Sequence, residues 1–390
     1  MAKKSSTPSH PDTQATELGR DPFRHYGVVN PPVYHASTIL YPTLKALRDR
    51  AQPYLYGRRG TPTSEALEEA VAGLEGGYRA MLCPSGLNAV TTALLAHVEA
   101  GDHILVSDSV YEPTRSFCDD VLARFGVETD YYDPRIGGGI GNLLRENTRL
   151  VFTESPGSQT FEVQDLPAIA KAAHAGGALV MIDNTWASPL YLDPFAHGVD
   201  ISIQAATKYI VGHSDAMLGT IATTEATYAK TRRQHGLIGV CAGPDDVYLG
   251  LRGLRTLSAR LERHMRTGIA LARWLEGRPE VKRVLHPALP SHPDHALWSR
   301  DFKGASGLFG VVLQPGSEEA LAAFLDGLAH FGMGFSWGGF ESLIVPAKPN
   351  RTAVPWQEDG QLVRIHAGLE HVDDLIADLE AGLTRYAAAL

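Results

Sequence analysis

The segment DISIQAATKYIVGHSD, residues 200–215, is a run of apolar and small residues that contains Lys208. Its first half is typical of a short buried strand, so we expect Lys208 to stand at the strand exit. Burial disfavours the charged ammonium group and lowers the pKa of a lysine. A neutral amine is a nucleophile that can form a Schiff base with a carbonyl compound. The alternative is a strand-end lysine whose head group reaches water.

A second apolar run lies within GALVMIDNTW, residues 177–186, and ends at the carboxylate of Asp183. It is typical of a buried parallel strand. Because ligands of open α/β sheets bind outside the carboxyl ends of the strands, Asp183 and Lys208 should lie at the same edge. Pyridoxal phosphate needs such a pair, a lysine for its aldehyde and a carboxylate for its ring nitrogen. Taken alone, Asp183 would more commonly be a helix N-cap.

A phosphate site is predicted where the strand 79–83 turns into the helix 87–97. The free N–H groups and the dipole of a helix N-terminus attract an anion. The dipole contributes only about 0.3–1 kcal/mol, so charge-assisted donors must add to it. An ordinary strand-to-helix turn is the alternative reading of this segment. The candidate phosphate-binding residues are Ser85, Gly86, Leu87, Thr207, Tyr56 and Arg58.

Short apolar strands alternate with helices from about residue 61 to residue 255. The predicted strands are 79–83, 103–107, 127–132, 149–154, 178–183, 200–204 and 217–223. This alternation predicts an α/β fold, a mostly parallel seven-stranded sheet with helices on both faces.

The segments that flank this alternating pattern differ in character. Residues 1–60 are predicted to form an irregular arm. A long amphipathic stretch from Asp246 to Trp274 leads into a smaller α/β domain, 256–390, which ends in a helix over 372–386. The glycine-rich segment 137–141 is predicted to be a flexible loop before a helix that starts in 142–146.

Composition restricts the possible partners and the cellular compartment. The chain has 390 residues and a formal net charge of −9, with no basic cluster, so a nucleic-acid surface is not expected. The three cysteines show neither a disulfide framework nor metal spacing, which predicts a reducing, cytoplasmic setting and no metal site. Residues 1–21 lack the apolar core of a signal peptide, and no apolar run is long enough to span a membrane.

Several motifs, in this order along the chain, resemble the Cys/Met-metabolism family of pyridoxal-phosphate enzymes. The matching segments are Tyr56–Thr63, Pro84–Gly86, Tyr111, Asp183–Ala187, Gln204–Met217, Leu251–Leu257, Ser336–Leu343 and Leu362–Leu369. The resemblance implies the aspartate-aminotransferase-like fold, fold type I, with residues 61–255 as the cofactor-binding domain. It also implies homotetramers built from catalytic dimers.

The resemblance assigns roles to individual residues. Lys208 would carry the cofactor and move protons, and Tyr111 would assist catalysis by stacking on the cofactor ring. Arg364 would bind the substrate α-carboxylate with help from Ser336, beside Trp337. Tyr56 and Arg58 would complete the phosphate site of the neighbouring subunit. Read without the resemblance, Tyr111 could be a core residue, and Arg58 and Arg364 could be solvated.

Within the family, Ser336-Trp337-Gly-Gly and Gln204-Ala-Ala-Thr resemble the β-lyase branch. That branch implies α,β-elimination of the amino acid L-cystathionine to homocysteine, pyruvate and ammonia, a step of methionine biosynthesis. A γ-lyase or a γ-synthase with the same cofactor is the near alternative. A non-catalytic ligand sensor on the same fold is the distant one.

Overall fold

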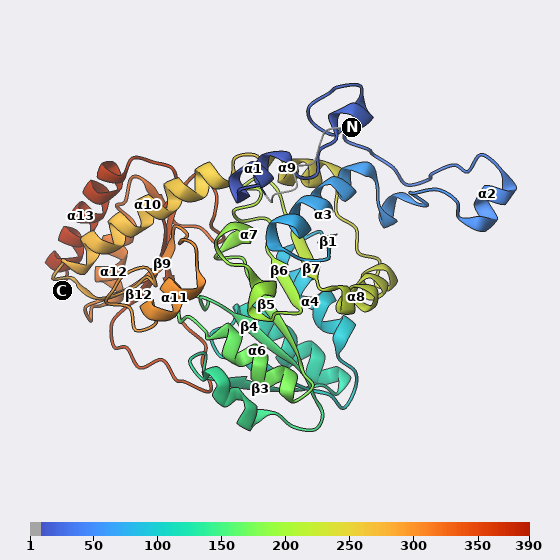
Figure 1. The fold of residues 1–390 in the computed structure, drawn as a ribbon. Helices are drawn as coiled ribbons and strands as arrows, with labels where there is room; N and C mark the ends of the chain where they lie inside the picture. The colour runs from blue at the N-terminus through green and yellow to red at the C-terminus, as the bar shows by residue number, and fades with distance from the viewer. Residues whose placement is uncertain (1–8) are drawn as a thin grey trace.

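The computed structural model describes residues 9–390, so the first eight residues of the predicted arm lie outside it. The larger sheet has seven strands in the order β1-β7-β6-β5-β4-β2-β3 (Figure 1). They are β1 (Arg79–Cys83), β2 (His103–Ser107), β3 (Glu128–Tyr132), β4 (Thr148–Glu154), β5 (Leu179–Asp183), β6 (Ile201–Gln204) and β7 (Gly219–Thr223). The pairs from β3 to β6 are parallel, whereas β7 is antiparallel to both β6 and β1. The predicted mostly parallel sheet is confirmed.

Helices cover both faces of this sheet. Along β2, Leu105 packs in one core cluster with Ile169 of α6 (Leu166–Ala175), while Ile104 and Val106 pack in another with Leu94 of α4 (Gly86–His97). This alternation is the period of two that a strand imposes on its side chains. The remaining helices of this region are α3 (Pro62–Glu75), α5 (Glu112–Ser116), η3 (Phe117–Leu122), η4 (Ala123–Phe125), α7 (Ser188–Tyr191), η6 (Pro194–His197), α8 (Glu225–Leu237) and α9 (Pro244–Leu254).

A second, five-stranded sheet has the order β10-β11-β12-β9-β8. Its strands are β8 (Val281–Leu285), β9 (Leu308–Leu313), β10 (Phe331–Gly332), β11 (Ser342–Ala347) and β12 (Leu362–His366). The surrounding helices are α10 (Leu257–Glu276), α11 (His295–Asp301), α12 (Glu318–Leu325) and α13 (Val372–Ala388). Leu379 of α13 and Phe309 of β9 are fully buried in one cluster. A smaller α/β unit, ending in the helix expected over 372–386, is therefore present.

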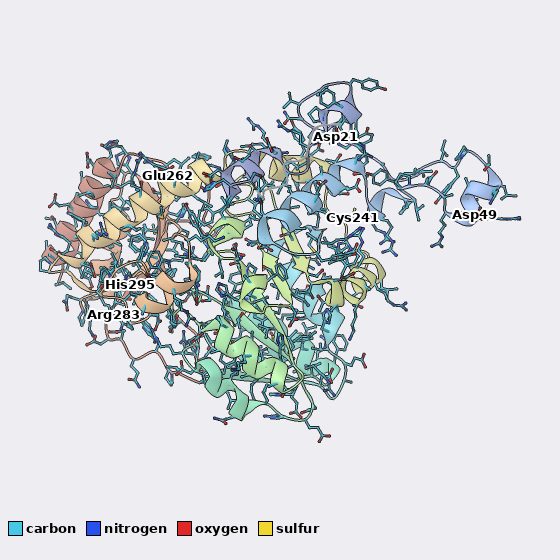
Figure 2. The ribbon with its side chains drawn as sticks, viewed as in Figure 1. Asp21, Asp49, Cys241, Glu262, Arg283 and His295 are labelled. Carbon is cyan, nitrogen blue, oxygen red and sulfur yellow. The ribbon has the colours of Figure 1, made fainter. Side chains whose placement is uncertain are left out.

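The N-terminal arm is partly helical, with α1 (Pro11–Glu17), η1 (Pro22–His25), α2 (Leu44–Asp49) and η2 (Gly57–Arg59). Helix α1 lies on the body of the protein, because Arg255 donates hydrogen bonds to the carbonyls of Ala15 and Leu18 at 3.0 and 2.8 Å. The segment that carries α2 instead projects away from the body (Figure 1). Asp49, which is labelled in Figure 2, lies at the far end of this segment.

One local prediction is wrong. Residues Gly137–Leu143 form the 3₁₀ helix η5, not a loop followed by a helix. Ile140 is fully buried there, and the segment packs on α6 at ordinary contact distances, since Cβ atoms on Gly138 and Gly141 would lie 3.9 and 3.7 Å from Ala168 and Ala172. The amphipathic stretch that begins near Asp246 consists of two helices, because α9 ends at Leu254 and α10 begins at Leu257.

No helix within residues 9–390 combines the length and the apolar character that crossing a bilayer requires.

Candidate active site

Lys208 lies in a turn, four residues after the end of β6. Its backbone N–H donates to the Ala205 carbonyl oxygen at 2.9 Å. Its Nζ donates to Ser336 Oγ at 2.5 Å and lies 5.3 Å from the centre of the Trp337 ring. Burial lowers the pKa of Lys208 to about 8, the Arg364 charge adds to this shift, and Asp183 opposes it. The lysine therefore deprotonates far more readily than a solvated one.

Asp183 ends β5, the strand paired with β6, and its side chain is almost buried. Its Oδ1 accepts hydrogen bonds from the Thr185 backbone N–H at 3.0 Å and from Thr185 Oγ1 at 2.5 Å. The next helix, α7, has Ala187 at its N-cap position, so Asp183 is not the helix cap that a single-residue reading suggests. Burial raises the pKa of Asp183, while the Thr185 bonds and Lys208 favour its ionised form.

The predicted phosphate site lies at the start of α4. Ser85 is the N-cap and its Oγ accepts from Asn88 N at 3.1 Å, which leaves the first N–H groups of the helix, those of Gly86 and Leu87, without intrahelical acceptors. A Cβ on Gly86 would lie 2.8 Å from Ala205 Cα, so only glycine lets the helix start approach the lysine turn this closely. The Thr207 hydroxyl is bonded to the Leu218 backbone, accepting at 2.8 Å and donating at 3.1 Å.

Tyr111 lies at the N-cap position of α5, four residues beyond the end of β2. Its side chain is 44% exposed, which argues against a buried core role. Its backbone N–H donates to Glu154 Oε2 at 2.7 Å. Burial raises the pKa of the Tyr111 hydroxyl, and the charge of Asp183 adds to the shift.

Glu154 is a site residue that our sequence reasoning missed. It ends β4 directly beside Asp183 in the parallel register. Burial, with a further contribution from Asp183, raises the pKa of Glu154 well above its usual range. The pattern that singled out Asp183, an apolar strand ending in a carboxylate, also occurs at Leu150–Glu154 and could have identified it.

Arg364 lies in the middle of β12, between β9 and β11. Its guanidinium donates to the Ser336 backbone carbonyl at 3.1 Å, and burial lowers the pKa of Arg364. Ser336, with a left-handed φ of 77°, therefore contacts the lysine through its hydroxyl and the arginine through its carbonyl. The three predicted residues Lys208, Ser336 and Arg364 form one hydrogen-bonded chain.

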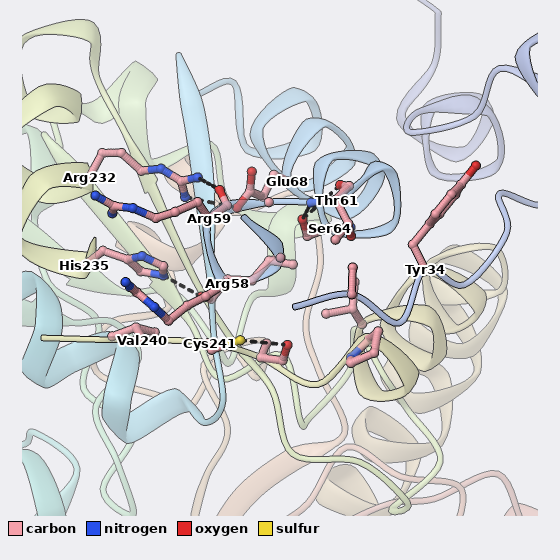
Figure 3. Close-up of a pocket in the computed structure, with 17 residues that line it drawn as sticks. Tyr34, Arg58, Arg59, Thr61, Ser64, Glu68, Arg232, His235, Val240 and Cys241 are labelled. Carbon is pink, nitrogen blue, oxygen red and sulfur yellow. Dashed lines mark hydrogen bonds and ion pairs between the residues drawn. The ribbon is translucent and has the colours of Figure 1, made fainter. Parts of the chain in front are cut away.

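Tyr56 and Arg58 lie outside the cluster formed by Lys208, Ser336 and Arg364 of the same chain. The Arg58 guanidinium donates to the Gly236 carbonyl at 3.0 Å and lines a pocket with Arg59, Arg232 and Glu68 (Figure 3). That pocket contains no residue of the Lys208 cluster. Tyr56 has a side chain that is 46% exposed. Among residues 9–390, no hydrogen bond or ion pair connects Tyr56 or Arg58 with Lys208.

The residues present fit pyridoxal phosphate. Lys208 offers an amine of lowered pKa, and one Asp183 oxygen is bonded to Thr185, which leaves the other as an acceptor for a ring N–H. The start of α4 offers N–H donors for the phosphate at close approach to the lysine turn. Arg364 provides a partly buried cation that can bind a substrate carboxylate in bidentate fashion.

Comparisons with known proteins agree with this arrangement. The family model described as Cys/Met metabolism PLP-dependent enzyme matches residues 12–384. The cystathionine beta-lyase of Escherichia coli is 45% identical over 96% of this chain and 98% of its own length. A protein of Rhizobium johnstonii, provisionally named cystathionine beta-lyase, is 55% identical over 97% of this chain and 96% of its own. A structure of the cystathionine gamma synthase of Xanthomonas oryzae with cystathionine has a TM-score of 0.90 and 32% identity, and the match covers 98% of this chain and 100% of that one.

Proposed function

The chain belongs to the Cys/Met-metabolism family of pyridoxal-phosphate-dependent enzymes, and we propose that it is a cystathionine β-lyase. The reaction is the α,β-elimination of L-cystathionine with one water to homocysteine, pyruvate and ammonia. The observation that carries the proposal is the hydrogen-bonded chain from Lys208 through Ser336 to Arg364. This chain of contacts supports the proposal because an amine of lowered pKa is connected through Ser336 to a guanidinium suited to a carboxylate, and β6 before it pairs with β5, which Asp183 ends.

When bound, the cofactor supplies an electron sink for the carbon that loses its proton. Arg364 holds the substrate α-carboxylate and thereby orients the Cα–H bond toward Lys208. Asp183 keeps the proton on the ring nitrogen. Each unit by which this contact raises the pKa of the ring nitrogen stabilises the protonated form by about 1.4 kcal/mol. The amine of Lys208 takes the Cα proton and, as the Cβ–S bond breaks, returns a proton to the departing sulfur. Ser336 directs that amine through its hydroxyl.

For the assembly, we propose catalytic dimers paired into a homotetramer, in which Tyr56 and Arg58 of one subunit bind the cofactor phosphate of the next. The exposed apolar side chains of the N-terminal arm support this, because such patches mark interaction surfaces. They are Phe23, Tyr26, Leu40, Leu44 and Leu47. The domain limits proposed with it are an arm over 1–60, a cofactor-binding domain over 61–255 and a C-terminal domain over 256–390.

We propose that the enzyme acts in the cytoplasm in methionine biosynthesis. All three cysteines are free thiols, two of them buried, which suits a reducing compartment.

The identity of the keto acid tests the reaction. The purified protein, loaded with pyridoxal phosphate and given L-cystathionine, should release pyruvate and homocysteine in equal amounts. Release of 2-oxobutyrate would instead assign a γ-lyase, and condensation of an activated homoserine with cysteine would assign a γ-synthase. A cofactor-loaded protein that releases no keto acid from cystathionine or other cysteine S-conjugates would contradict the lyase assignment altogether.

A further inference from the structure

We propose that His366 is a positioning residue of this site. Its imidazole accepts a hydrogen bond from the Gly338 backbone and so holds the turn that presents Ser336 and Trp337 to Lys208. The catalytic part of this inference depends on the proposed function. The structural part, which concerns one backbone hydrogen bond, does not depend on it.

The turn needs an external support because its backbone is strained. Ser336 has φ 77° and Gly338 has φ 87°, and a residue other than glycine in the left-handed region costs free energy, so it persists only where the surroundings enforce it. A Cβ on Gly338 would lie 2.9 Å from the Lys208 carbonyl carbon and 3.0 Å from its Cα. The turn therefore packs directly on the lysine backbone, and a shift of the turn would move the lysine and its serine partner relative to each other.

The imidazole of His366 supplies the support. His366 lies two residues after Arg364 on β12, so the two side chains share one face of the strand. The side chain is 1% exposed, and Nε2 lies 3.1 Å from the Gly338 nitrogen. A backbone N–H can only donate, so Nε2 must carry the lone pair. The Gly339 carbonyl, 3.3 Å from the same Nε2, would be its partner only if that nitrogen were protonated.

The surroundings favour the neutral ring, and the bond from Gly338 then places its proton on Nδ1, for which residues 9–390 provide no hydrogen-bond acceptor. Burial lowers the pKa of His366 well below its usual range, and the charges of Arg364 and Lys208 and the neighbouring His264 act in the same direction. The His366 ring lies 5.1 Å from that of His264 and 6.0 Å from that of Tyr209, between centroids. Tyr209, which follows Lys208 in the chain, is in turn 5.5 Å from Trp337. His366 thus links the segments that provide Lys208, Ser336 and Arg364.

Two variants of matched size separate the hydrogen bond from the volume of the side chain. In His366→Gln, the amide oxygen can take the place of Nε2 as acceptor. In His366→Met, an unbranched apolar side chain of similar length cannot. Hydrogen exchange of the segment 336–341 in the cofactor-loaded protein should be about fivefold faster in the methionine variant than in the glutamine variant, the effect of one lost hydrogen bond.

Kinetics provide the second readout. With L-cystathionine, the methionine variant should lose roughly 10- to 100-fold in kcat, as expected for a slightly misplaced catalytic group, with a smaller change in KM. The glutamine variant should restore most of this loss. Equal losses in both variants, or wild-type behaviour of both, would overturn the proposal. If the wild-type enzyme proves inactive while the exchange difference persists, the proposed function fails and the structural inference stands.

The wild-type protein offers a test that needs no variant, should the methionine variant fail to fold. The Gly338 N–H should exchange more slowly than the N–H of Gly339, which has no hydrogen-bond acceptor among residues 9–390. Equal exchange rates at the two glycines would overturn the assignment of the hydrogen bond.

Discussion

The edge of the large sheet and the projecting arm present their functional side chains in opposite ways. Beyond the carboxyl end of β6 in the large sheet, Lys208 is held by a hydrogen bond to Ser336, which also binds Arg364 from β12 of the second sheet. In the arm, Leu44 and Leu47 are 60% and 50% exposed, although apolar side chains normally gain by burial. The contacts around Lys208 form within one chain, whereas the arm leaves apolar side chains exposed that the proposed neighbouring subunit would cover.

The largest expected effect concerns the lysine. Lys208→Ala should lower kcat roughly 10³-fold or more, because covalent attachment and proton transfer are lost together. The exposed Lys171 on α6 provides the control, and its alanine variant should keep wild-type turnover. Turnover and the visible absorbance of the bound cofactor measure the effect. Unchanged turnover in Lys208→Ala would refute the site.

The pKa of Lys208 makes a second prediction, for the cofactor-free protein. Below pH 8 the amine is mostly protonated and unreactive, and as pH rises through about 8 it becomes neutral. At pH 7 the neutral fraction should exceed that of an ordinary lysine, whose pKa is near 10.4, by about 10²-fold. Aldehyde labelling followed by reduction and peptide mapping would measure the midpoint. A midpoint above 10 would show that burial does not tune this amine.

The arm can be tested by mixing variants. Arg58→Ala should weaken cofactor binding about 10- to 100-fold through loss of a charge-assisted bond to phosphate. If Arg58 serves the neighbouring subunit, mixing Arg58→Ala and Lys208→Ala chains should restore activity to about a quarter of wild type, because hybrid dimers contain one complete site. A mixture no more active than its two components would place Arg58 in the site of its own subunit.

The smallest effect on the single chain is expected at α2. Leu44→Ser with Leu47→Ser should change the free energy of unfolding of the subunit by no more than about 0.5 kcal/mol, since both side chains are exposed. Subunit association should nevertheless weaken, which sedimentation at decreasing protein concentration would measure. Leu379→Ser in the buried cluster of α13 is the contrast and should destabilise the fold itself. Unaltered association would remove the arm from the proposed interface.

Local sequence patterns account for the parts of the fold that could be predicted. All seven strands of the large sheet were predicted to within about two residues of their observed bounds, because each is a short apolar run between polar turns. The order of β5 and β6, with Asp183 at the end of one and Lys208 beyond the other, follows from the same pattern. The Gly137–Leu143 helix was missed because glycine adopts many backbone conformations, so a glycine-rich sequence does not indicate a helix. Only packing against α6 decides its conformation.

The residue types and their order along the chain were sufficient to establish an α/β fold and a lysine–aspartate pair suited to pyridoxal phosphate. The joining of Ser336 and Arg364 to Lys208, the contact of Glu154 with the Tyr111 backbone, and the His366–Gly338 bond became visible only in three dimensions. The physical reason is that strand periodicity acts over neighbouring residues. The contacts named here join residues 28 to 128 positions apart and depend instead on how strands, turns and helices pack together in the tertiary structure.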